Sequence, residues 1–130
     1  MIFITGGAFQ GKTDTACQLF GVKRSDIVSG HDCGFEDLFT AVCINCYHRL
    51  VARLMEADID PVEFTERLCS RNKDCIIIMD EIGCGIVPME KKERIYRENV
   101  GRCGCIIAAE SEKAVRVLCG IPQYLKGGAK

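Results

Sequence analysis

The sequence lacks the features that mark several large classes of protein. It contains no tryptophan, only three prolines and two histidines, and its 17 lysines and arginines nearly balance 18 aspartates and glutamates. With a net charge of −1, the chain has no overall field that would attract nucleic acid or an anionic membrane. No apolar run approaches the ~20 residues needed to span a bilayer. Any site for an anionic ligand must therefore be local.

The start of the chain also lacks the basic region, apolar stretch and cleavage site of a signal peptide. We therefore expect a cytoplasmic protein, and the length fits one domain over residues 1–130. Ten cysteines are present, but without an export signal a disulfide framework is not expected. Most occupy positions where alanine or valine would fit, such as Cys75 and Cys119. We interpret most of them as small buried hydrophobic residues.

Predicted strands and helices alternate along the chain, which favours an α/β fold with a mainly parallel sheet. The predicted strands cover residues 2–5, 26–29, 75–79, 114–119 and 123–125. The predicted helices cover residues 12–20, 35–56, 61–72 and 90–109. In the first helix, Ala16, Leu19 and Phe20 are expected to face inward. The strand at 75–79 is continuously apolar, so we expect it at the centre of the sheet, buried on both faces.

A phosphate-binding loop is predicted directly after the first strand. Residues 6–13, Gly-Gly-Ala-Phe-Gln-Gly-Lys-Thr, fit the pattern G-x-x-x-x-G-K-[ST] at every fixed position. Glycines let the backbone wrap round phosphate, and the following helix presents free N–H groups at its N-terminus. The predicted nucleotide-binding residues are Gly6, Gly7, Ala8, Phe9, Gln10, Gly11, Lys12, Thr13 and Asp14. Among these, Lys12 is expected to contact the β- and γ-phosphates as a catalytic residue.

Two carboxylates follow the central strand. Asp80 and Glu81 come directly after the apolar residues 76–79, and parallel strand ends converge on the rim that carries the phosphate loop. We predict that Thr13 and Asp80 hold Mg²⁺. Glu81 is predicted to orient or deprotonate the attacking group. The alternative for both carboxylates is a solvated acidic turn after a core strand.

Three segments carry a resemblance to a known family. Residues 80–88, Asp-Glu-Ile-Gly-Cys-Gly-Ile-Val-Pro, resemble the segment Asn-Glu-Val-Gly-x-Gly-Ile-Val-Pro of the adenosylcobinamide kinase/adenosylcobinamide-phosphate guanylyltransferase family. Residues 94–102 are similar to its Arg-x-Phe-Arg-Asp-x-x-Gly-Arg, and residues 4–12 are similar to its opening Val-Thr-Gly-Gly-Ala-x-x-Gly-Lys. Together these segments cover under half of the chain.

The resemblance implies a RecA-like P-loop NTPase fold with three layers, and often a trimer. It implies a kinase that uses ATP or GTP with Mg²⁺ to phosphorylate a cobinamide hydroxyl, with Arg97 as a further catalytic residue. The family's second activity transfers GMP from GTP through a guanylylated histidine. This chain is shorter between the first helix and Asp26, where that histidine belongs, and neither His31 nor His48 has the family's sequence context. The resemblance therefore extends to the kinase and not to guanylyl transfer.

Other interpretations stay open at this point. One is a regulatory nucleotide-binding ATPase that has lost the corrinoid site. Another is a metal- or redox-responsive protein that uses Cys43-x-x-Cys46 with His48, or Cys103-x-Cys105. The arginines of the last predicted helix, Arg94, Arg97 and Arg102, fit either a phosphate clamp or a solvated helix face. His31 and Asp32 fit either a substrate contact or a surface turn. No motif distinguishes ATP from GTP.

Overall fold

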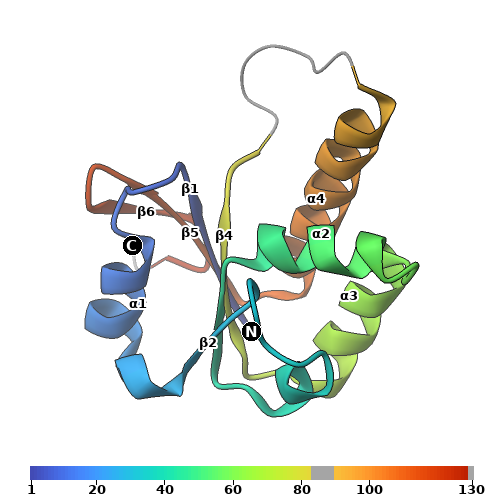
Figure 1. Cartoon of the computed structure of the whole chain (residues 1–130). Coiled ribbons are helices and arrows are strands. Elements are labelled where there is room, and N and C mark those ends of the chain that lie inside the picture. The colour runs from blue at the N-terminus through green and yellow to red at the C-terminus, as the bar shows by residue number, and fades with distance from the viewer. Residues whose placement is uncertain (83–89, 129–130) are drawn as a thin grey trace.

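The computed structural model describes residues 1–82 and 90–128, and its centre is a six-stranded sheet in the order β2-β3-β4-β1-β5-β6 (Figure 1). The strands are β1 Ile2–Gly6, β2 Ile27–Ser29, β3 Cys43–Asn45, β4 Ile76–Asp80, β5 Lys113–Leu118 and β6 Ile121–Lys126. The helices are α1 Lys12–Phe20, α2 Tyr47–Glu56, α3 Pro61–Arg71 and α4 Lys91–Glu110, with short 3-10 turns at Arg24–Asp26 and Glu36–Thr40. Strands β1 to β5 are parallel and β6 is antiparallel to β5.

The sheet separates two hydrophobic cores. Helix α1 covers one face, where Ala16 packs with Ile4 and Ile78. Helices α2, α3 and α4 cover the other face and pack on Phe3 and Ile77 (Figure 1). The alternation along β1 and β4 sends neighbouring side chains to opposite cores. The three layers confirm the predicted α/β fold of the P-loop NTPase type, and β4 is the central, buried strand that was predicted.

The predicted helix over residues 35–56 is wrong. Its first half is a 3-10 turn followed by β3, which pairs in parallel with β2 and β4, and only Tyr47–Glu56 is α-helix. The apolar residues of this segment belong to three different elements, namely the 3-10 turn, β3 and α2. Their combined spacing along the sequence matches the period of a single helix, which led to the wrong prediction. Val42, an apolar residue of the same segment, is 53% exposed. In α1 the expectation for Leu19 is also wrong, because its side chain is 45% exposed.

Helices α3 and α4 begin at or next to the residues that the sequence indicates. Asp60 accepts hydrogen bonds from the N–H groups of Val62 and Glu63 and so caps α3. Helix α4 continues through both of its glycines. At Gly104 a Cβ atom would lie 2.9 Å from the Met79 Cε atom. Glycine at this position leaves room for the end of the Met79 side chain between α4 and the sheet.

The interpretation of the cysteines as small buried hydrophobic residues is correct for some of them. Burial raises the pKa of the Cys43 and Cys75 thiols to about 12 and that of Cys69 to about 11, so these three remain protonated. Cys119, which was expected to be buried, is exposed. Within residues 1–82 and 90–128, no group of three or more His, Cys, Asp or Glu side chains is arranged to hold a metal ion. In the same ranges no helix combines the length and apolarity needed to cross a membrane.

Candidate nucleotide site

The phosphate loop lies between the end of β1 and the start of α1. Gly6 has a φ of 151°, and a Cβ atom there would lie 2.4 Å from the Val117 carbonyl oxygen. Gly11 precedes α1 with a left-handed φ of 91°. Only glycine adopts both positions without strain. The loop thus folds with its backbone close to the sheet, and Lys12 begins the helix as predicted.

Sheet register brings the acidic end of β4 to this loop. Gly6 pairs with Asp80 across the two strands, and the Glu81 N–H donates to the Gly6 carbonyl at 2.9 Å. The Lys12 Nζ atom lies 2.7 Å from the Asp80 Oδ1 atom and 2.6 Å from the Gly7 carbonyl oxygen. Lys12 is only 7% exposed, so this ion pair is largely shielded from solvent. The two predicted motifs therefore meet in space.

The end of β3 adds a residue that the sequence interpretation missed. The Asn45 side-chain amide donates to the Thr13 Oγ1 atom at 3.2 Å, and its oxygen accepts the Cys46 N–H at 2.7 Å. Asn45 therefore holds the Thr13 hydroxyl in a cleft that the Asp80 side chain also lines. Neutral and anionic oxygens of this kind are the ligands that Mg²⁺ prefers, so Thr13 and Asp80 fit that ion.

A cleft of about 380 Å³ joins these groups. It is lined by most of the predicted loop and by residues from β3, β4 and α2, namely Ala8, Phe9, Gln10, Gly11, Lys12, Thr13, Asp14, Asn45, Cys46, His48, Arg49 and Asp80. Gly6 and Gly7, which were also predicted to bind nucleotide, belong to the same loop but are not among the residues that line the cleft. Phe9 is fully exposed and has a φ of 60°, and Asp14 forms an ion pair with Arg24. The cleft offers backbone amides and one buried ammonium group to a polyphosphate.

The loop is also braced from the far end of the chain. The β5–β6 hairpin turns at Cys119 and Gly120, both of which have positive φ. The Gly120 N–H donates to the Gln10 carbonyl at 2.9 Å, and the Cys119 N–H donates to the Gln10 side-chain oxygen at 2.7 Å. Because Gln10 is bonded through both its backbone and its side chain, the hairpin limits movement of the phosphate loop.

His48 supports Asp80 from the first turn of α2. Its Nδ1 atom accepts the Asp80 N–H at 3.2 Å, and its Nε2 atom lies 3.5 Å from the Asp80 Oδ2 atom. The side chain is buried, and burial lowers the pKa of His48, although the neighbouring Asp80 carboxylate partly opposes that shift. The neutral imidazole therefore holds both the backbone and the carboxylate of Asp80.

This burial makes the stability of the fold depend on pH. Because the pKa of His48 lies below 6.5 in the folded state, the unfolded chain binds a proton that the folded chain does not bind as pH falls through 6.5. The free energy of unfolding should therefore decrease between pH 7.5 and 5.5. Urea unfolding of a His48→Gln variant should show a smaller decrease over that range. If the free energy of unfolding decreases equally with pH in the two proteins, His48 is not the group responsible for the decrease.

The remaining predicted residues occupy different surroundings. Glu81 accepts hydrogen bonds from the Arg116 Nε atom at 2.7 Å and from its second nitrogen at 3.1 Å, so both carboxylate oxygens are engaged. Arg97 lies on α4 and is not among the residues that line the nucleotide cleft in the described part of the chain. His31 and Asp32 lie in an exposed turn after β2, and Arg102 pairs with Glu98 on the α4 surface. The family-like segment at 83–88 lies outside the described residues.

Comparison with known families complements this geometry. Comparison with curated proteins gives no match. The family model for "cobinamide kinase / cobinamide phosphate guanyltransferase" matches residues 32–125. That range covers more than half of the chain and includes Asn45, His48 and Asp80, but it begins after the phosphate loop. The loop and the family match are therefore separate pieces of evidence. Together with the P-loop architecture, they show that the chain belongs to the cobinamide kinase / cobinamide phosphate guanyltransferase family, whose members use nucleoside triphosphates in cobalamin biosynthesis.

Proposed function

We propose that this protein transfers the γ-phosphoryl group of ATP or GTP to the hydroxyl group of a cobinamide, with Mg²⁺. The observation that carries the proposal is the pairing of Lys12 with Asp80 at the adjoining ends of β1 and β4, within a chain of this family. One group is suited to the phosphates and the other to the cation that accompanies them. Their 2.7 Å contact has to open when a nucleotide with its cation enters.

In the proposed reaction, the acceptor oxygen forms a bond to the γ-phosphorus, and the bond from that phosphorus to the β–γ bridging oxygen breaks. The nucleoside diphosphate leaves, and the hydroxyl proton passes to a base or to water. Loop amides and Lys12 stabilise charge on the transferred group. Thr13 and Asp80 would hold Mg²⁺, which neutralises phosphate charge when bound.

This proposal includes Glu81 as the base that takes the hydroxyl proton, and that role requires the Glu81 carboxylate to be released from its present contacts. Both Glu81 oxygens are bonded to Arg116, so the carboxylate reaches an acceptor proton only when that pair opens. Arg97 stays a prediction from the family resemblance. Guanylyl transfer is not included, because the ring nitrogens of His48 both face Asp80 in a buried position and His31 lies in an exposed turn.

The proposal is tested by incubating the protein with cobinamide, Mg²⁺ and either ATP or GTP labelled in the γ-phosphate. We expect label to appear in a phosphorylated cobinamide and not when the label is in the α-phosphate. Comparing the two nucleotides determines the base preference. If the protein binds nucleotide and hydrolyses it at the same rate with and without cobinamide, the regulatory ATPase is the correct interpretation.

A further inference from the structure

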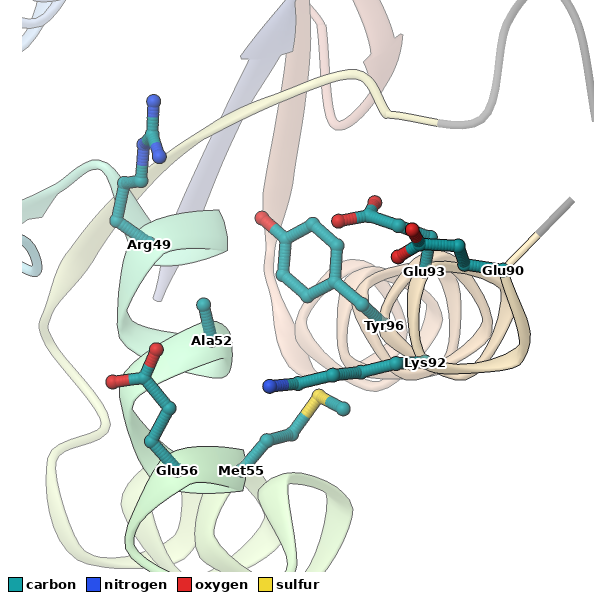
Figure 2. A pocket seen from close by; sticks show the side chains of 8 residues that line it. All are labelled: Arg49, Ala52, Met55, Glu56, Glu90, Lys92, Glu93 and Tyr96. Carbon is teal, nitrogen blue, oxygen red and sulfur yellow. The ribbon is translucent and has the colours of Figure 1, made fainter. Parts of the chain in front are cut away.

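A second, larger cleft lies beside the nucleotide site, between α2 and α4 (Figure 2). Its volume is about 670 Å³, compared with about 380 Å³ for the nucleotide cleft. The polar side chains that line it are Arg49, Glu56, Glu90, Lys92, Glu93 and Tyr96. Figure 2 shows Lys92 and Tyr96 extending from α4 toward α2, with the Glu56 side chain on the α2 side of the opening. Neither the phosphate loop nor the Lys12–Asp80 pair accounts for this cleft.

The two clefts meet at Arg49, which lines both of them. Tyr96 joins the second cleft to the nucleotide site from the other helix, because its hydroxyl donates to the His48 carbonyl at 2.9 Å. His48 in turn contacts Asp80. A molecule that occupies the second cleft would therefore extend toward the phosphates past Arg49. A phosphoryl acceptor needs this arrangement, because its hydroxyl must reach the γ-phosphate while the rest of it lies outside the nucleotide site.

The charges of the cleft indicate the kind of molecule that it suits. Three carboxylates and two cationic groups line it, and among residues 1–82 and 90–128 none of these five forms an ion pair. The carboxylates accept hydrogen bonds, whereas Arg49 and Lys92 donate them. A primary amide offers both a donor and an acceptor and carries no charge. A second polyphosphate would be repelled by the three carboxylates.

We propose that the α2–α4 cleft binds the amide-bearing edge of the cobinamide acceptor, with Arg49 between the acceptor and the nucleotide. This inference rests on the proposed function and adds the location of the acceptor. The carboxylates Glu56 and Glu93 receive amide N–H groups, and Lys92 donates to an amide oxygen. Arg49, at the junction, contacts the end of the acceptor that carries the hydroxyl.

The test measures cobinamide affinity by calorimetry, with the protein loaded with Mg²⁺ and a non-hydrolysable ATP analogue. We expect a Glu56→Ala/Glu93→Ala variant to bind cobinamide about 100-fold more weakly or worse, because it loses two charge-assisted hydrogen bonds and each typically costs at least about tenfold. Its affinity for the ATP analogue should stay within about twofold, since neither residue lines the nucleotide cleft. A Glu56→Gln/Glu93→Gln variant retains carbonyl acceptors and should recover most of the cobinamide affinity.

The matched control is Glu66→Ala/Glu98→Ala, which removes the same charge from exposed positions on α3 and α4 outside both clefts. The control should bind cobinamide like the unchanged protein. If the Glu56→Ala/Glu93→Ala variant also binds like the unchanged protein, the acceptor does not use this cleft, although the kinase proposal stands. If the unchanged protein binds no cobinamide in either the presence or the absence of nucleotide, the kinase proposal itself fails.

Discussion

Replacing Lys12 by alanine is expected to reduce phosphoryl transfer by about 10³-fold and nucleotide affinity by about 10²-fold, as the loss of a preorganised charged donor does in other active sites. Lys12 is the buried cation of the phosphate loop, and its ammonium group already lies within 2.7 Å of a carboxylate and 2.6 Å of a loop carbonyl. Lys12 therefore already lies in the cleft, where its ammonium group exchanges the Asp80 carboxylate for phosphate when a nucleotide enters. Calorimetric titration with ATP and GTP, followed by the labelled-phosphate assay, measures the two effects.

The same substitution also leaves the Asp80 carboxylate without its cationic partner, which lowers the stability of the fold. A Lys12→Ala/Asp80→Asn variant removes the unpaired charge, so its stability should recover while transfer stays absent. Lys23→Ala is the matched control, because Lys23 is exposed and does not line the nucleotide cleft. Unchanged nucleotide affinity in a folded Lys12→Ala protein would remove the basis of the proposed function.

The Asp80→Asn variant should still bind nucleotide, but magnesium should no longer strengthen that binding. In the free protein Asp80 competes with phosphate for Lys12, so we expect affinity for nucleotide in EDTA to be equal to or higher than that of the unchanged protein. With magnesium the unchanged protein should gain affinity and the variant should not. Transfer should fall at least about 100-fold, since the cation has lost its anionic ligand.

Asp74→Asn is the control for this experiment, because Asp74 is an exposed carboxylate near the opposite end of β4. Titrations in EDTA and in magnesium give four affinities for each protein, two for ATP and two for GTP. If magnesium strengthens nucleotide binding to Asp80→Asn as much as to Asp74→Asn, then Asp80 does not hold the ion, and the cation site must be sought elsewhere along the cleft.

The parts of the site that are continuous in sequence could be predicted, and the parts that depend on sheet register could not. The phosphate loop is eight consecutive residues in which each fixed position has a local reason, so its place between β1 and α1 followed directly. Asp80 was predicted because an apolar strand ends there. Asn45 and the contacts of His48 with Asp80 were missed, because β3 has only three residues and its buried positions, together with those of α2, fit the period of one predicted helix.

Two further features of the sheet were not predicted from the sequence. The bond between Glu81 and Arg116 joins the ends of β4 and β5 on either side of β1, and no local pattern indicates that order. The last strand was predicted over residues 123–125 but spans Ile121–Lys126. The two strands are joined by a two-residue turn with positive φ at both Cys119 and Gly120, and because cysteine is not typical of such a turn, the sequence did not indicate where β6 begins.

The bracing of Gln10 by the β5–β6 hairpin has a consequence for biosynthesis. Cys119 lies 109 residues after Gln10 in the sequence, yet Cys119 and Gly120 supply two of the bonds that hold the phosphate loop. Strand β1 likewise lies between β4 and β5, which are both made much later. A ribosome-bound chain therefore acquires a braced loop only after Gly120 has emerged. A nascent chain that stops short of β5 should accordingly gain no stabilisation from cellular ATP or GTP.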